Sequence, residues 1–252
     1  MNLLRGGALL VGLLGVATAT QAGVTSTWTV TNDYDFRGNT QSAKNPALQA
    51  SLDYAHESGW YVGAWASNID FGVTEVPGGL KDPGLELDVY TGFTKSLDNG
   101  ITYDVGIVGY TYPDESDFNY FEVYGSIAKG WFKGKVWYSP KFGGNAAEDL
   151  ALAGPEATKD VGAYYVEANG TFPLPNNFSI TAHVGYSGGD YWDNAFGDSQ
   201  VDYAAGIGYT AGKFSLGLKY VDTDSDVKVT SDAFNNEGRV IFTVATTFPW
   251  GE

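Results

Sequence analysis

Hydrophobic and polar residues alternate along most of the chain between Val24 and Phe248. In the segment 84–95, for example, Val89 and Phe93 occupy one parity, and Asp88 occupies the other. A period of two is typical of a β-strand with one apolar and one polar face. The pattern predicts twelve strands, at 25–37, 47–56, 60–70, 84–95, 101–111, 117–128, 131–139, 161–172, 177–187, 200–210, 213–222 and 238–248.

The connections between these strands alternate in length. The long ones are 38–46, 71–83, 112–116, 140–160, 188–199 and 223–237, and the short ones lie around 57–59, 96–100, 129–130, 173–176 and 211–212. Antiparallel barrels of the outer membrane have short periplasmic turns and longer outer loops, and an even number of strands. We therefore expect an all-β chain that forms a transmembrane antiparallel up-and-down barrel of about twelve strands.

The first residues have the pattern of an export signal. Arg5 precedes an apolar run from about Ala8 to Val16, and small residues follow up to Ala22. This order is typical of a secretory signal peptide, and the apolar run is short for a membrane anchor. We expect residues 1–22 to be a signal peptide, 23–252 to be one barrel domain, and the protein to lie in the outer membrane of a Gram-negative bacterium.

Composition and charge narrow the function classes. The formal net charge of −16 repels nucleic acid, so nucleic acid is not an expected partner. The chain has no cysteine, which excludes disulfides and thiol catalysis, and with two histidines and one methionine it has few ligands for soft metals. We expect no cofactor. Aromatic residues at 15% and 34 glycines suit an all-β chain.

Along each strand, the apolar positions are predicted to face lipid and the alternate, polar positions to face the lumen. Membrane lipid is therefore an expected partner of the chain. The apolar parity carries aromatic residues near the strand ends, which fits two aromatic girdles; they are Trp28, Tyr34, Phe36, Tyr54, Phe93, Tyr103, Phe132, Tyr138, Tyr164, Phe172, Phe178, Tyr186, Tyr203, Tyr209, Phe214, Tyr220 and Phe248. The polar parity carries the charged candidates for lining the lumen and setting selectivity; they are Asp33, Asp35, Arg37, Asp53, Glu86, Asp88, Asp104, Glu122, Lys133, Lys135, Glu167, Asp202, Lys213, Lys219 and Arg239, together with His183. Large aromatic residues share this parity; they are Tyr61, Trp65, Tyr90, Tyr120, Tyr124, Trp131 and Trp137.

A twelve-stranded barrel encloses a narrow lumen, which such side chains would constrict or fill. Charges there need partners or water, so a salt-bridge network that stabilises the barrel competes with a selectivity filter as their role. The acidic excess would favour cations if a pore is open. In the stretch DYDFRGNTQS we expect Arg37 at the outer end of the first strand, near Asp53, and a turn at Gly38 and Asn39.

Two features of the sequence could indicate metal binding or catalysis, and neither completes the required pattern. Asp222 to Asp226 resembles the start of a calcium loop, but Val227 and Ala233 stand where that loop needs glycine and an acid, so a solvated loop is favoured. The histidines His56 and His183 are not next to a Gly-x-Ser-x-Gly nucleophile. We therefore expect no enzyme activity.

Several segments carry a family resemblance. YDFRGNTQS, NPALQASLDYAHESGWYVGAWASNIDF, LELDVYTGFTKSLDNGITYDVGIVGYTYP and FEVYGSIAKGWFKGKVWYSPKF resemble, in this order, the TorF family of proteobacterial outer-membrane porins. The likeness runs from about Thr25 to the C-terminus and depends on the order and spacing of the segments. It implies an outer-membrane barrel with a transport role and supplies no catalytic residues.

The main functional prediction is a porin-like barrel that lets small solutes and ions diffuse passively, with a leaning toward cations. A non-conducting structural or adhesive barrel, binding through its outer loops, is the alternative. An outer-membrane enzyme and a soluble secreted β-protein have less support from the pattern.

Overall fold

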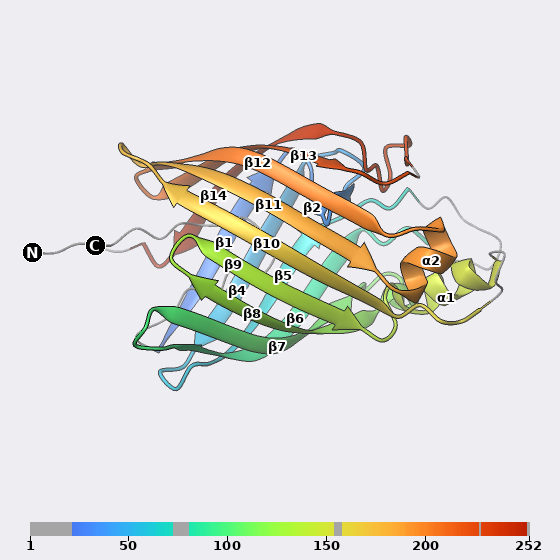
Figure 1. Ribbon diagram of the computed structural model, residues 1–252, viewed down its shortest axis with the longest axis horizontal. Helices are drawn as coiled ribbons and strands as arrows, with labels where there is room; N and C mark the ends of the chain where they lie inside the picture. Colours follow the sequence, from blue (N-terminus) through green and yellow to red (C-terminus); the bar gives the residue numbers. More distant parts are fainter. Residues whose placement is uncertain (1–21, 73–80, 154–157, 227, 251–252) are drawn as a thin grey trace, which may run out of the picture.

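The computed structural model describes residues 22–72, 81–153, 158–226 and 228–250. The predicted signal peptide lies outside these ranges, apart from Ala22. Twelve antiparallel strands of the described chain close into one barrel (Figure 1). They are β1 (Gly23–Thr31), β4 (Ala47–Ala55), β5 (Trp60–Asn68), β6 (Leu85–Ser96), β7 (Ile101–Thr111), β8 (Tyr120–Lys129), β9 (Phe132–Ser139), β10 (Ala163–Pro173), β11 (Phe178–Gly188), β12 (Gln200–Ala211), β13 (Phe214–Thr223) and β14 (Arg239–Phe248).

Each strand pairs with its neighbours in the sequence, and β1 closes the barrel by pairing with β14. The prediction of a twelve-stranded up-and-down barrel is therefore confirmed. The short connections lie at one end of the barrel, which we call the turn end, and the long ones at the other, the loop end. The loop end carries η1 (Ser116–Phe118), α1 (Gly144–Ala153) and α2 (Asp190–Phe196) (Figure 1).

The outer surface of the barrel is apolar and the interior holds buried aromatic and charged residues. Val89, Ile107 and Val184 point outward and are 53%, 42% and 48% exposed. Tyr124 and Trp137 point inward and are buried. This is the inverse of a water-soluble barrel and matches the predicted parities.

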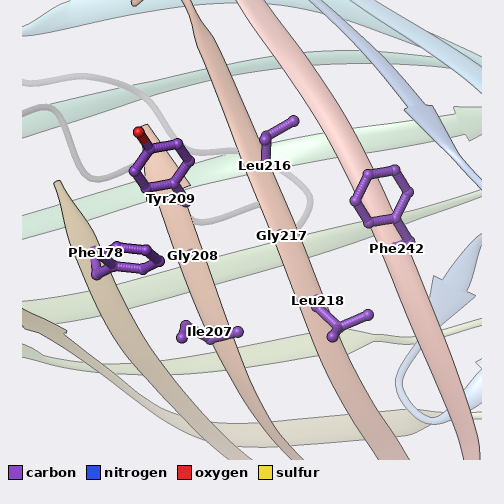
Figure 2. Close-up of a pocket in the computed structure, with 8 residues that line it drawn as sticks. All are labelled: Phe178, Ile207, Gly208, Tyr209, Leu216, Gly217, Leu218 and Phe242. Carbon is purple, nitrogen blue, oxygen red and sulfur yellow. The ribbon is translucent and has the colours of Figure 1, made fainter. Parts of the chain in front are cut away.

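An apolar depression lies on the outer surface near the turn end. It lies over β11 to β14, and Figure 2 shows its lining of Phe178, Ile207, Gly208, Tyr209, Leu216, Gly217, Leu218 and Phe242. This lining carries no charged side chain, as expected for a surface that faces lipid. None of the helices in the described part of the chain is long and apolar enough to span a membrane.

The first strand differs from its prediction, because β1 ends at Thr31. The chain then forms a hairpin of two short strands, β2 (Asp35–Phe36) and β3 (Asn39–Thr40). Its turn is Arg37-Gly38, with φ angles of 52° and 85°. Positive φ at both central residues is the type I′ geometry of two-residue hairpins. The predicted turn at Gly38 and Asn39 is therefore wrong by one residue.

This β2–β3 hairpin folds into the barrel interior. Tyr34 is only 3% exposed and meets Trp65 of β5 edge-on, with ring centroids 5.4 Å apart. Phe36 meets Tyr110 of β7 at 6.1 Å. The prediction that Tyr34 and Phe36 face lipid is therefore wrong. A period of two describes a strand and an inward hairpin equally well, so the pattern did not separate them.

Trp131 is a second correction to the predicted lumen. It lies in the turn between β8 and β9, is 55% exposed, and packs on Phe172 at a centroid distance of 4.6 Å. Trp131 therefore lies at the rim of the barrel on the turn end and does not line the interior, because β9 begins one residue later than predicted.

Candidate functional site

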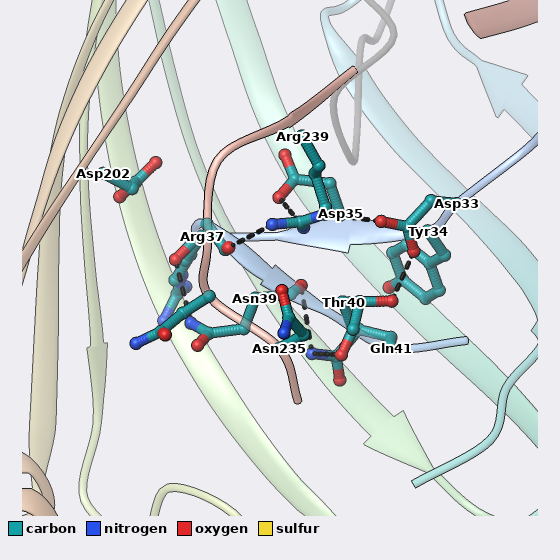
Figure 3. Close-up of polar contacts among 12 residues, drawn as sticks. Asp33, Tyr34, Asp35, Arg37, Asn39, Thr40, Gln41, Asp202, Asn235 and Arg239 are labelled. Carbon is teal, nitrogen blue, oxygen red and sulfur yellow. Dashed lines mark hydrogen bonds and ion pairs between the residues drawn. The ribbon is translucent and has the colours of Figure 1, made fainter. Parts of the chain in front are cut away.

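The β2–β3 hairpin crosses the lumen, and ion pairs hold its root to the wall. Arg239 of β14 donates to Asp33 through Nε at 2.5 Å and to Asp35 through Nη2 at 2.8 Å. Lys219 of β13 donates to the other oxygen of Asp35 at 2.7 Å. Figure 3 shows Arg239 beside Asp33 and Asp35. Four predicted lumen residues thus form one network that fixes the loop between β1 and β4.

The tip of the hairpin is held by a second ion pair on the opposite wall. Arg37 donates to Glu122 of β8 through both terminal nitrogens, at 3.0 and 2.6 Å. The two side chains are 6% and 0% exposed. Tyr110 also donates to Glu122, at 2.9 Å. A two-point contact of this kind fixes both position and orientation of the guanidinium. The predicted neighbour Asp53 is therefore wrong as the partner of Arg37.

Aromatic rings surround the same guanidinium. Its central carbon lies 4.5 Å from the ring centroid of Tyr165 and 5.6 Å from those of Trp137 and Phe142. Phe36 of the hairpin lies at 4.6 Å. Cations within about 6 Å of an aromatic face are attracted by the ring quadrupole. Arg37 therefore sits in a cage of one carboxylate and several rings.

The backbone of the turn fits closely against the wall. Gln200 donates to the carbonyl oxygen of Arg37 at 2.9 Å, and Arg239 donates to that of Gly38 at 2.8 Å. A Cβ atom on Gly38 would lie 2.5 Å from Thr223 Cγ2 and 2.8 Å from Asp202 Cβ. Only glycine combines this approach with the positive φ of the turn. The Arg37-Gly38 pair is thus shaped for this site.

Two acids of β6 lie buried near the loop end of the lumen. Glu86 is 3% and Asp88 0% exposed. Glu86 Oε2 and both carboxylate oxygens of Asp88 have no hydrogen-bond partner among the described residues. Burying such groups in the charged form without a partner is costly, so each needs water, a cation or a bound proton.

Two further acids lie nearer the turn end and are satisfied by tyrosines. Tyr90 and Ser51 donate to Asp53, the latter at 2.7 Å. Tyr61 donates to Asp104 at 2.7 Å. Among the described residues neither acid forms an ion pair. The wall from β4 to β7 therefore carries acids that form no ion pair with a base among the described residues.

The predicted lysines take different positions. Lys135 of β9 is buried over the rings of Tyr124 and Trp137, at 3.8 and 3.6 Å, and its ammonium has no hydrogen-bond partner among the described residues. Lys133 lies one inward position closer to the turn end and is partly exposed. Lys213 is exposed in the turn between β12 and β13, 4.6 Å from the ring of Trp250, so it lies at the rim.

The remaining candidates form a network on β10 to β12. His183 Nε2 lies 2.7 Å from Asp202 Oδ1, and its Nδ1 lies 2.8 Å from Asn169 Oδ1. Tyr165 donates to Asp202 at 2.9 Å. Glu167 accepts from the Trp137 indole at 2.9 Å. These contacts hold Tyr165 and Trp137 in place around Arg37.

The pKa of Asp35 is lowered within this loop. Burial alone would raise it, but the nearby charges of Lys219 and Arg239 lower it by more. The hairpin is not one of the membrane-spanning strands, and its aspartate stays ionised in the folded protein at neutral pH.

The segment Asp222 to Asp226 is predicted to be a solvated loop, but it begins within β13, which ends at Thr223. Asp224 accepts from the backbone amide of Val201 at 2.8 Å, and Asp222 accepts from Tyr220 at 2.9 Å. Over the described ranges, no group of three or more histidines and acids is placed to hold a metal ion.

Sequence reasoning placed the charged residues in the interior but missed several parts of the cage. It assigned Tyr165 to neither face and Phe142 to a loop, and it did not single out Gln200. The signal for Tyr165 was present, since it shares the parity of Glu167 on one strand. Nothing in the pattern indicated that a residue 85 positions away would pair with Arg37.

Comparisons with known proteins agree with this fold. A family model described as "Bacterial protein of unknown function (Gcw_chp)" matches residues 17–248. The chain belongs to this family. None of the reported matches names a TorF family, so the resemblance of the sequence to that family stays a prediction. No curated protein matches the chain.

Among solved structures, this member of the Gcw_chp family is similar to two porins. A structure titled "KdgM porin" has a TM-score of 0.53 and 7% identity, and covers 90% of this chain and 99% of its own. A NanC porin has a TM-score of 0.53 and 9% identity over the same shares. Another KdgM structure, with disordered oligogalacturonate, has a TM-score of 0.51 and 7% identity and covers 90% and 99%. At these identities the likeness shows the fold, which is that of outer-membrane porins.

Proposed function

We propose that this protein is an outer-membrane channel of a Gram-negative bacterium through which small solutes and ions diffuse, and that the β2–β3 hairpin constricts its lumen. Residues 1–22 are the export signal and 23–252 the barrel domain in this proposal. The apolar outer surface and the porin fold support the location. The observation that carries the proposal is the hairpin in the lumen, tied to the wall at Asp35 and Arg37 by ion pairs.

Buried polar atoms indicate that the lumen holds water. The three unpartnered oxygens of Glu86 and Asp88 and the ammonium of Lys135 are shielded from bulk solvent. Such groups are retained where ordered water can reach them. A narrow hydrated path is sufficient for small ions.

The charges of the path favour cations. Four acids on β4, β6 and β7 lack a basic partner among the described residues; they are Asp53, Glu86, Asp88 and Asp104. Among the described residues of the lumen wall, the lysines that form no ion pair are Lys133 and Lys135. An excess of acids in a pore raises the local concentration of cations. A polyanion such as the oligogalacturonate named for the KdgM structure would be repelled by these acids.

A non-conducting barrel is the second candidate. The buried rings of Tyr34, Tyr110, Tyr124 and Trp137 belong to one hydrophobic cluster. If the hairpin never moved, this cluster and the ion pairs would act as a permanent plug. The barrel would then serve as a platform for its outer loops.

Single-channel recording of the refolded protein in a planar bilayer tests the proposal. We expect small, discrete conductance steps and, in a salt gradient, a reversal potential that favours the cation. Stable insertion without any steps would support the plugged barrel and refute the channel. Steps with an anion-selective reversal potential would refute the role of the acids while leaving the channel intact.

A further inference from the structure

We infer that the cage around Arg37 is a binding site for the guanidinium group of a solute, which the protein's own arginine occupies in the closed channel. The inference rests on the proposed channel and names the class of solute that its constriction recognises. The wall part of the site consists of Glu122, Tyr110, Trp137, Phe142 and Tyr165, and we call it the cation cage.

The carboxylate of Glu122 is oriented to accept two parallel hydrogen bonds from a planar, bidentate donor. Both oxygens of Glu122 accept from Arg37, and one of them also accepts from Tyr110. The side chain of Glu122 is fully buried. A buried carboxylate that loses its partner is strongly destabilised, so binding of a replacement cation beside Glu122 is favoured.

The rings of the cage select a flat and weakly hydrated cation. Tyr165, Trp137 and Phe142 lie within 5.6 Å of the guanidinium carbon. Guanidinium stacks on aromatic faces and loses less hydration than an ammonium ion does. Sodium, potassium and ammonium ions match the charge but not the two parallel hydrogen bonds. Anions are repelled by Glu122.

The cage and its occupant belong to different parts of the fold. The five wall residues lie on β7, β8, β9, β10 and the residues directly after β9, whereas Arg37 is the tip of a loop. Displacing the hairpin would therefore leave the cage intact. A guanidinium-bearing solute then competes with Arg37 for the same atoms and favours the displaced state by its differential affinity. The site couples recognition of the solute to opening of the constriction.

Chemical rescue of Arg37→Ala tests this inference. The substitution empties the cage, and we add methylguanidinium as the probe to the refolded variant in detergent micelles. We expect a dissociation constant on the order of 1 mM, because so small a ligand buries little surface. At about ten times that concentration the thermal unfolding midpoint should rise by ~4 °C. Sodium chloride at equal ionic strength and urea, a neutral isostere, should give no such rise.

The double variant Arg37→Ala/Glu122→Gln is the matched control, since it keeps the rings and the cavity but removes the carboxylate charge. We expect it to lose the rescue. Equal rescue of both variants, or no rescue of Arg37→Ala, overturns the inference. If Arg37→Ala does not refold, the yield of folded barrel with and without methylguanidinium is the readout, and an unchanged yield overturns it as well.

Conductance separates this inference from the channel proposal. In planar bilayers methylguanidinium should block the Arg37→Ala channel about tenfold more tightly than the double variant. Conducting channels that show neither block nor thermal rescue refute the cage and leave the channel standing. Thermal rescue in a barrel that never conducts supports the cage and refutes the channel.

Discussion

Gly38 is the position where the smallest chemical change should displace the hairpin. Its φ of 85° is favourable for glycine alone, and a methyl group there would approach Thr223 Cγ2 to 2.5 Å and Asp202 Cβ to 2.8 Å. Neither neighbour can easily yield. Thr223 donates to the carbonyl of Asn236 at 2.8 Å, and Asp202 accepts from Tyr165 at 2.9 Å.

The cost of Gly38→Ala follows from these two effects. An L-residue in the left-handed region loses about 1 kcal/mol. Contacts of 2.5 and 2.8 Å lie well inside the carbon–carbon optimum of 3.5–4.0 Å, and overpacking of this kind costs roughly 1–3 kcal/mol. The sum of ~2–4 kcal/mol is a ~30- to ~900-fold shift toward the displaced hairpin. Moving the hairpin away from β12 and β13 relieves these contacts without breaking a strand pair of the barrel, so the fold should persist.

Single-channel recording measures the shift as a higher fraction of time spent in the larger conductance state. Gly100→Ala is the control, because Gly100 has a φ of 80° in a turn between β6 and β7 and no atom within 4 Å of its added Cβ. It carries the same backbone penalty without the contact with the wall. We expect it to conduct like the wild type. If Gly38→Ala also conducts like the wild type, the hairpin does not gate the lumen in the way described.

Three further predictions concern the root, the outer surface and the acids. The basic partners of Asp35 lower its pKa, so its ion pairs hold the hairpin at any pH above about 4, the usual aspartate value. These ion pairs weaken as the pH falls through the lower pKa that Asp35 has in the folded protein. Conductance should therefore stay constant from about pH 7 to 5 and rise below about pH 4, and a rise that begins near pH 6 would contradict this. Ile107→Arg places a charge on the outward face of β7, where the side chain is 42% exposed. It should lower the free energy of unfolding in micelles by ~2–4 kcal/mol, whereas Ile107→Leu should not lower it. Equal stability of the two variants would argue against lipid at that face. The pair Asp53→Asn and Asp104→Asn removes two lumen acids that form no ion pair among the described residues and should move the reversal potential in a salt gradient toward zero; an unchanged potential would show that these acids do not face the ion path.

The barrel itself could be predicted from the sequence because its signals are local and repeated. The period of two in segments such as 84–95 sets the inward and outward faces, and the alternating connections set the topology. Residues such as Glu86, Asp88 and Glu122 therefore came out on the correct face. Helix α1 and helix α2 fell within predicted long loops, whose internal structure the pattern did not address.

The constriction could not be predicted because it depends on one break in the pattern and on contacts between distant parts of the chain. Asp33 to Arg37 continue the alternation of β1, yet they leave the sheet after Thr31. Arg-Gly is a weaker hairpin signal than Asn-Gly or Asp-Gly. The choice of Glu122 over Asp53 as the partner of Arg37 is decided by where the tip reaches across the lumen. No property of the sequence near Arg37 encodes that distance.

Replacing residues 33–41 by a short Gly-Ser linker tests the central claim most directly. The change removes the β2–β3 hairpin and keeps all twelve barrel strands. We predict that the refolded variant inserts into planar bilayers and conducts several times more current per channel than the wild type. Equal conductance of the two proteins would contradict the claim that this hairpin constricts the lumen.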